Sequence, residues 1–190
     1  MKYLKIFLGI IAFLALIFIA SGFLKPTISY SSEIIVDKPA EEAWAVMNDE
    51  SKTSQWLDGI KKQEHISGEK GTIGAVTKYT FDENGDESII METITALRPN
   101  EHISMDFVME GAMEMDYKMD ATAKDGKTHI KSTTIAKGTG WFMRSMLSFM
   151  TSTMQAQEDK NMNNLKKLID SNTTAYFPAP IVESVEVVQE

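Results

Sequence analysis

Cysteine occurs nowhere among the 190 residues of the sequence. Its absence excludes disulfides, thiolate nucleophiles, iron–sulfur clusters, cysteine zinc sites and a lipidated amino-terminal cysteine. Basic residues are scarce as well, with 19 lysines and arginines against 27 acidic residues and a net charge of -8. Because this charge repels phosphate backbones and the basic residues form no stripe, we expect no nucleic-acid partner.

Motifs that carry metal or cofactor chemistry are also lacking. The chain has three histidines, His65, His102 and His129. They are too scattered for a zinc pattern, and the acidic turn at 82–86 lacks the spacing of a calcium loop. The glycine-rich stretch 68–74 lacks the lysine and hydroxyl residue that end a phosphate-binding loop. We therefore assign no catalytic, metal or cofactor-binding residues.

One long apolar run lies near the amino terminus, where residues 6–24 read IFLGIIAFLALIFIASGFL without a charge. As a helix this run would extend about 28 Å at 1.5 Å per residue, which is enough to cross a bilayer. Lys2 and Lys5 precede the run and Lys25 follows it, a slight basic excess that favours a cytoplasmic amino terminus. We predict a transmembrane anchor over residues 1–25 in the cytoplasmic membrane, with the domain on the extracytoplasmic side.

Two other interpretations of this run stay open. A cleavable signal peptide, which would leave a secreted domain, fits the basic start MKYLK and the small residues at 20–22. The run is longer than the roughly 7 to 15 residues of a signal core, and Phe23 and Leu24 extend it, which favours the anchor. A buried core helix is disfavoured because the run is apolar on every face.

Beyond Pro26 the chain alternates between turn signals and short strand-like segments. Residues 28–36 predict a first strand, and the two glutamates after Pro39 mark a short helix, followed by a second one as far as Leu57. Turn signals then separate six further strands. We expect these near residues 60–67 and 72–81, between the turns at 82–86, 98–100, 111–112 and 124–127, and at 128–137.

A long stretch without proline or glycine follows at residues 141–171. Its apolar residues recur at mostly helical spacing, which predicts one long helix. The last segment, 172–190, has two prolines and an acidic, valine-rich end, so we expect a flexible tail, with a late strand or a docked extension as alternatives. The predicted fold class is α+β, with seven antiparallel strands and one long helix in a domain over residues 28–171.

The order of these elements resembles that of the START-like superfamily. Residues 34–56, IIVDKPAEEAWAVMNDESKTSQW, are similar to its first strand and two following helices. Gly71 and Gly74 before a strand, Leu-Arg-Pro at 97–99, and GTGWFMRSML at the start of the long helix support a match over residues 28–171. This superfamily includes birch-pollen-allergen-type carriers and the polyketide cyclase/dehydrase family. The resemblance implies a helix-grip fold, in which a curved sheet wraps around the long helix and encloses a cavity for an apolar ligand.

Two neighbouring strands alternate regularly between polar and apolar residues. Residues 103–109 and 113–119 each place methionines and aromatic rings on one face. Methionine is flexible and polarizable, so a site lined with it can repack around ligands of different shape. We predict an apolar cavity, with simple core filling as the alternative. The candidate ligand-binding residues are Tyr79, Phe81, Met105, Phe107, Met109, Met115, Tyr117, Met119, Met146 and Met150.

Few polar residues are candidates for the wall of this cavity. Glu92 points either inward, where its pKa would rise, or outward, because its apolar neighbours have both parities. Tyr79 and Tyr117 are expected inward, where a hydroxyl meets either a ligand or a neighbouring side chain. Strand parity places His102 and His129 on the solvent face.

Three functions fit these observations. The first is the binding of a hydrophobic small molecule or lipid by a domain held at the membrane. The second is an enzyme of the polyketide cyclase or dehydratase kind, which would use Tyr79, Tyr117 or Glu92 as proton donors or acceptors. The third is a protein-interaction module with a vestigial pocket, for which the sequence names no partner. We expect the first, and a binding protein rather than an enzyme.

Overall fold

The structure, a computed structural model, describes residues 2–83 and 85–177, apart from the side chain of Glu83. Its helices are α1 (Lys2–Leu24), α2 (Ala40–Met47), the 3-10 helix η1 (Glu50–Lys52), α3 (Thr53–Trp56) and α4 (Gly140–Asp170). Its strands are β1 (Thr27–Val36), β2 (Ile60–Ser67), β3 (Val76–Glu83), β4 (Asp86–Arg98), β5 (His102–Met109), β6 (Met113–Lys124) and β7 (Lys127–Gly138).

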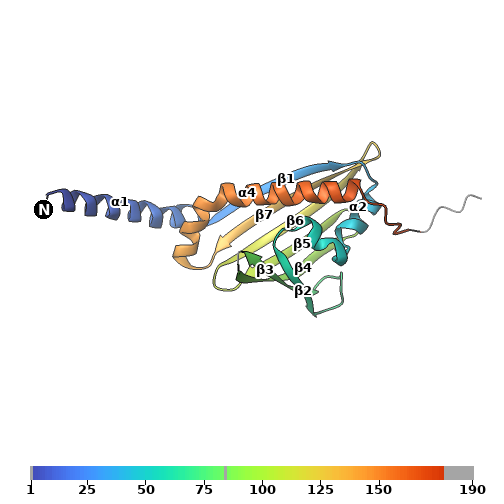
Figure 1. Ribbon diagram of the computed structural model, residues 1–190, viewed down its shortest axis with the longest axis horizontal. Helices are drawn as coiled ribbons and strands as arrows, with labels where there is room; N and C mark the ends of the chain where they lie inside the picture. The colour runs from blue at the N-terminus through green and yellow to red at the C-terminus, as the bar shows by residue number, and fades with distance from the viewer. Residues whose placement is uncertain (1, 84, 178–190) are drawn as a thin grey trace, which may run out of the picture.

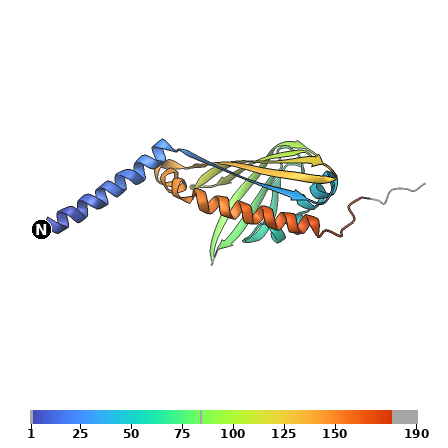
Figure 2. The same ribbon diagram turned by 90° about the horizontal axis from the view of Figure 1, so that it is seen from above.

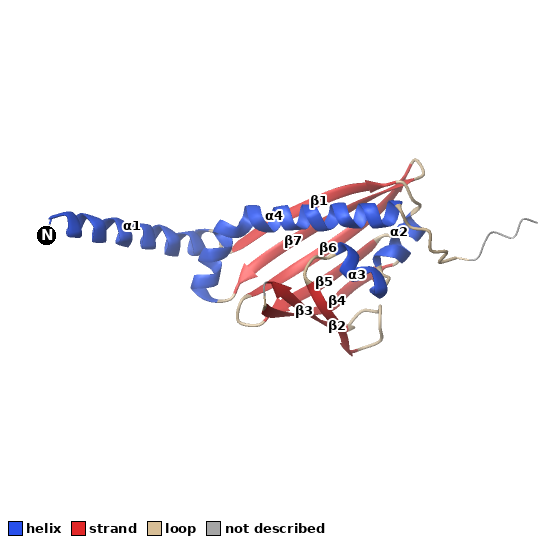
Figure 3. Cartoon of the chain, viewed as in Figure 1, coloured by secondary structure: helices blue, strands red, loops and turns tan. Residues whose placement is uncertain are grey.

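All seven strands belong to one antiparallel sheet, in the order β1-β7-β6-β5-β4-β3-β2. From β2 to β7 each strand pairs with the next along the chain, and β1 pairs with β7. The sheet curves around α4, which lies along β1 and β7 (Figures 1 and 2). The short helices α2 and α3 lie over the same face as α4 (Figure 3). The predicted α+β helix-grip fold is therefore confirmed.

The register of β5 and β6 aligns their apolar residues across the ladder. Met105 lies opposite Tyr117, Phe107 opposite Met115, and Met109 opposite Met113. Their neighbours Asp106, Glu114 and Asp116 are exposed on the other face. Because residues two apart on a strand share a face, this pairing gathers the sulfur-bearing and aromatic side chains on the side that α4 covers.

A β-bulge in β4 explains the mixed parity around Glu92. The register between β4 and β5 shifts between Ile94 and Ala96, so one extra residue is inserted there. Before the bulge Glu92 and Ile94 are buried; beyond it Leu97 packs against the same core. Both parities of apolar residues therefore face inward on the same strand, and Glu92 points to the interior.

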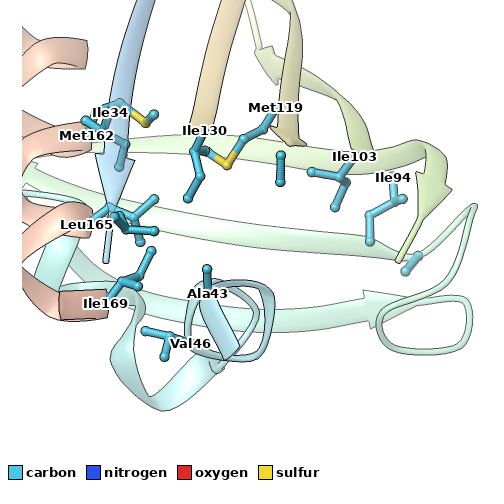
Figure 4. Close-up of a cluster of buried hydrophobic side chains, with 13 residues drawn as sticks. Ile34, Ala43, Val46, Ile94, Ile103, Met119, Ile130, Met162, Leu165 and Ile169 are labelled. Atoms are coloured by element: carbon cyan, nitrogen blue, oxygen red, sulfur yellow. The ribbon is translucent and has the colours of Figure 1, made fainter. Parts of the chain in front are cut away.

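The hydrophobic core, whose side chains Figure 4 shows, lies at the end of the domain farthest from α1 (Figure 1). Met162, Leu165 and Ile169 from the last turns of α4 are fully buried there, against Ala43 and Val46 of α2. The sheet contributes Ile34, Ile94, Ile103, Met119 and Ile130. A smaller cluster of Ile28, Tyr30, Ala136 and Leu147 lies nearer α1. Two packed regions therefore flank the middle of the domain.

The predicted start of the third strand is corrected. We expected it near residue 72, but β3 begins at Val76. Gly71 and Gly74 have φ angles of 70° and 87°, a left-handed conformation that strands do not use. Residues 68–75 therefore form a loop, which Ala75 ends by accepting the backbone N–H of Ile94 at 3.1 Å.

The long helix α4 changes direction after its first turns (Figure 1). In this region hydroxyl side chains bond back to the helix: Ser145 donates to the carbonyl of Trp141 at 3.0 Å and Ser148 to that of Arg144 at 3.2 Å. Such back-bonding competes with the backbone ladder and bends helices. The first turns of α4 consequently lie across the direction of the rest of the helix.

The chain after α4 folds back onto α2 and η1 as far as residue 177. Asn172 is buried, and its side-chain oxygen accepts a hydrogen bond from Lys52 at 2.8 Å. The hydroxyl of Tyr176 donates to Asp49 at 2.7 Å. The first residues of the predicted tail are thus a docked extension, while residues 178–190 lie outside the described residues.

The amino-terminal helix α1 extends away from the domain (Figure 2). By length and composition it could cross a membrane, a test that a signal sequence also passes. Only its carboxyl end touches the domain, where Gly22 is buried against Ser145 of α4. Two residues then lead into β1, so α1 and the sheet are directly connected.

Candidate ligand-binding cavity

A cavity of about 590 Å³ lies between the sheet, the α2–α3 region and α4. This volume is in the range of small-molecule sites in proteins. All seven strands of the sheet contribute residues, among them Tyr30, Tyr79, Glu92, Phe107, Met115 and Thr134. Trp56 and Leu57 line it from α3 and the following turn, and Met154, Gln157 and Glu158 from α4.

Eight of the ten predicted residues line this cavity. They are Tyr79, Phe81, Met105, Phe107, Met109, Met115, Tyr117 and Met119. Phe107 and Tyr117 meet edge to face with ring centres 5.9 Å apart, and Tyr79 and Phe81 are 6.4 Å apart. Their assignment to ligand binding stays a prediction, but strand alternation places them together.

The placement of Met146 and Met150 is corrected, because neither lines the cavity. The bend in α4 carries its first turns toward α1, so Met146 is 39% exposed on the surface. The α4 residues that line the cavity lie instead in the next stretch of the helix, which begins at Met154. Helical periodicity did not indicate this because it assumes a straight axis.

Glu92 is the most deeply buried carboxyl group of the cavity. Its side chain comes from β4, is 9% exposed overall, and has Tyr79 of β3 as its hydrogen-bond donor. Burial raises the pKa of Glu92 to about 7; the bond from Tyr79 opposes the rise, and the nearby Glu50 carboxylate adds to it. The cavity therefore holds an acid that is partly protonated at neutral pH.

A second carboxyl–phenol pair joins α4 to the sheet. The hydroxyl of Tyr117 donates to Glu158 at 3.4 Å. Burial raises the pKa of Glu158 above its ordinary value, and hydrogen bonds from Ser132 and Tyr117 oppose that rise. Burial also raises the pKa of Tyr30, which lies near Glu158, to about 12. This pair was not predicted, although a glutamate on the apolar side of the long helix was its signal in the sequence.

One polar atom of the cavity wall is left without a partner. The indole nitrogen of Trp56 is buried and has no hydrogen-bond acceptor among the residues that the structure describes. An unpaired N–H in such a place costs roughly 1 to 3 kcal/mol. An acceptor atom on a bound molecule would remove that cost.

Charged residues form the rim. Lys70 pairs with Glu50 at 2.9 Å, and Lys160 of α4 pairs with Asp58 in the turn after α3. These pairs are more than a third exposed, so each contributes little to stability. His65 also reaches the rim, where its ring nitrogen lies 3.0 Å from the carbonyl of Gly68.

The other two histidines lie away from the cavity. His102 bonds Asp120 at 2.7 Å and Ser104 at 2.8 Å, and His129 lies 3.8 Å from Glu33. Within residues 2–83 and 85–177, no group of three or more histidine, aspartate or glutamate side chains is placed to hold a metal ion.

The fold and cavity define a helix-grip protein, and comparison with known families identifies the family to which it belongs. The family described as "Polyketide cyclase / dehydrase and lipid transport" matches residues 27–170. The chain therefore belongs to this family, whose members share a ligand-binding or cyclase/dehydrase type of fold. No curated protein matches the chain in sequence.

Solved structures share the same architecture at low sequence identity. Ara h 8.0201 is 18% identical, with a TM-score of 0.61 over 77% of this chain and 99% of its own. The Zhui aromatase/cyclase from a Streptomyces species is 14% identical, with a TM-score of 0.58 over 75% of this chain and 91% of its own. A protein from Thermus thermophilus is 11% identical, with a TM-score of 0.62 over 75% of this chain and 97% of its own. At these identities the similarity establishes the fold alone.

Proposed function

We propose that this protein binds an apolar or lipid-like small molecule between its sheet and α4 while α1 holds the domain at a membrane. The observation that carries the proposal is the cavity of about 590 Å³, walled by methionines and aromatic rings. Such a wall favours apolar ligands and adapts to their shape. In this proposal α1 spans the cytoplasmic membrane, with its amino terminus in the cytoplasm and the domain outside.

The polar groups of the cavity define one further property of the ligand. The N–H of Trp56 can only donate a hydrogen bond, and Glu92, when protonated, donates as well. The two carboxyl groups Glu92 and Glu158, the first buried and the second partly buried, would repel an anionic group. We therefore expect an apolar body that carries an uncharged acceptor, such as a ketone, an ester or a hydroxyl. A fatty-acid methyl ester should bind more tightly than the corresponding carboxylate at pH 8.

Native mass spectrometry of the full chain in mild detergent tests the binding function directly, because a copurified molecule would identify the ligand class. Displacement of a fluorescent fatty-acyl probe from the delipidated chain gives an affinity. A chain with no saturable uptake of fatty-acyl, isoprenoid, sterol or aromatic probes would contradict the proposal.

A matched pair of variants locates the binding site. Met115→Gln places an amide in the cavity, whereas Glu114→Gln places the same amide on the exposed face of β6. Burying an unpaired amide costs roughly 1.4 kcal/mol on scales that allow partial compensation, which corresponds to about tenfold weaker binding. We expect this loss for Met115→Gln and an unchanged affinity for Glu114→Gln. Equal affinities would place the ligand elsewhere.

Carbonate washing of membranes, with the mass of the mature chain, tests the tether separately. Release into the supernatant, or a chain shortened near residues 20–22, would identify α1 as a signal sequence. The cavity and its ligand would be unaffected by that result.

The second candidate function is a cyclase or dehydratase, and the position of Glu92 favours it. A cavity acid with a pKa of about 7 can give its proton to a departing hydroxyl group while a base removes the neighbouring carbon-bound proton, so that water is lost. Incubation with a β-hydroxy ketone tests this function. Time-dependent loss of water that Glu92→Gln abolishes would support an enzyme, whereas unchanged recovery of the ketone favours binding alone.

A further inference from the structure

The first turns of α4 form a separate amphipathic segment, which we call the α4 entry segment (residues 141–150). Because of the bend, this segment lies across the direction of α1 (Figure 1). A helix that lies in a membrane surface likewise lies across the direction of a helix that crosses the membrane. The sequence WFMRSMLSFM supplies aromatic and methionine side chains interrupted by Arg144 and two serines.

The α4 entry segment is fixed to the carboxyl end of α1 by close contacts. Gly22 approaches so closely that a β-carbon on it would lie 2.6 Å from the backbone nitrogen of Ser145. The ring of Phe18 stacks on Phe149 with centres 5.8 Å apart and meets Phe142 at 5.7 Å. Because the two helices interlock in this way, the position of α1 determines the position of the segment.

The outer surface of the segment is apolar and uncovered. Trp141 is 54% exposed, Phe142 52% and Phe149 62%, and Phe23 and Leu24 at the end of α1 are exposed as well. Several large apolar side chains gathered at one exposed site mark a surface that binds something. The continuity with α1 indicates what covers it.

Depth along α1 identifies a bilayer as the partner. Phe18 lies six residues before Leu24, which is about 9 Å along a helix at 1.5 Å per residue. Interfacial helices bury their apolar face roughly 5 to 10 Å into the boundary between headgroups and acyl chains, and tryptophan is enriched at that level. Phe142 and Phe149, which touch Phe18, would reach the same depth.

We propose that the α4 entry segment lies in the membrane interface beside α1 and seats the domain on the lipid surface. This inference rests on the proposed membrane anchorage by α1. The turn between β5 and β6 lies next to the start of the segment, because the backbone N–H of Thr139, which precedes α4, donates to the carbonyl of Ala112 in that turn at 2.8 Å. Met109 and Met113 on either side of this turn line the cavity. Seating the segment therefore brings the methionine-lined end of the cavity to the bilayer, from which an apolar ligand can enter.

Single-cysteine spin labelling tests the seating, since the native chain has no cysteine to compete for the label. The full chain is reconstituted in phosphatidylcholine vesicles with a label at Met146→Cys, at Ile11→Cys inside α1, or at Asn163→Cys. Asn163 is exposed on α4 about 25 Å further along the helix, and serves as the matched control. Collisions with oxygen report lipid, and collisions with a water-soluble nickel chelate report water.

We expect labels at positions 11 and 146 to be more accessible to oxygen than to nickel, and the label at 163 to give the reverse. If position 11 is in lipid while 146 behaves like 163, the seating is wrong and the tether stands. If position 11 is also in water, the tether fails and the seating fails with it.

A fluorescence measurement covers the case in which Met146→Cys does not fold. Brominated lipids quench tryptophan only at short range, and Trp141 is the tryptophan of the segment. Wild-type chain in brominated vesicles should lose a component of its emission that the conservative variant Trp141→Phe lacks. Equal quenching of both proteins would overturn the seating.

Discussion

Replacement of Glu92 by glutamine should make the chain more stable at alkaline pH. The amide keeps the size of the carboxyl group and its ability to accept the hydrogen bond from Tyr79, but it cannot ionise. In the wild-type protein the charge of Glu92 lies deep inside the cavity, where no cation among the described residues lowers the pKa of this carboxyl group. The variant removes that charge and leaves the surrounding apolar wall intact.

The size of the effect follows from the shift in pKa. Burial raises the pKa of Glu92 from 4.5 to about 7, so between these values the folded state binds more protons than the unfolded state. The free energy of unfolding therefore falls as the pH rises through this window. At 1.36 kcal/mol per unit, the full difference is about 3 kcal/mol, as an upper limit if water does not enter the cavity. Glu92→Gln should match the wild type near pH 4 and exceed it above pH 7.

Urea unfolding of the full chain in mild detergent, followed by tryptophan fluorescence between pH 4 and 8, measures this difference. Glu114→Gln serves as control, because the same change on the exposed face of β6 should leave the pH dependence unchanged. A Glu92→Gln curve with the same slope as the wild type between pH 5 and 7 would refute the reasoning, since it would mean that Glu92 ionises as if in water.

Three other perturbations follow from the packing. Met162→Ala, at a fully buried core side chain that does not line the cavity, should destabilise the fold by about 2 to 5 kcal/mol. Met115→Ala at the cavity wall should cost less stability and mainly weaken ligand binding, and thermal unfolding with probe titration separates the two effects. Gly22→Val should separate α1 from α4, because its β-carbon would overlap Ser145. A loss of cross-linking between two cysteines introduced for the assay, one on each helix, would report the separation. Tyr176→Phe should expose the chain after α4 to limited proteolysis, and an unchanged cleavage rate would argue that its hydroxyl does not hold the extension.

Strand periodicity predicted most of the cavity because it depends on local geometry alone. Once β5 and β6 pair as a hairpin, the alternation of Met105, Phe107, Met115 and Tyr117 can place them only on one face. The same regularity gave the seven strands and the long helix. Boundaries that depend on left-handed glycines, such as the start of β3, were less well predicted.

What the sequence did not reveal depends on interruptions of regular geometry. The bulge after Ile94 hid the inward direction of Glu92, because parity counts fail across an inserted residue. The bend in α4 moved Met146 out of the cavity and brought in Glu158, which pairs with Tyr117 only in the folded sheet. Both features come from long-range packing that no single segment encodes.

If α1 is inserted in a membrane, as proposed, the short link between α1 and β1 restricts where this protein can act. Lys25 and Pro26 alone separate the helix from the first strand, and proline stiffens that junction. With α1 inserted in a bilayer, the two-residue link would be too short to let the domain move away from the membrane surface. Any exchange of cargo would then be a two-dimensional encounter, confined to donors and acceptors that diffuse in the same lipid sheet or rest directly on it.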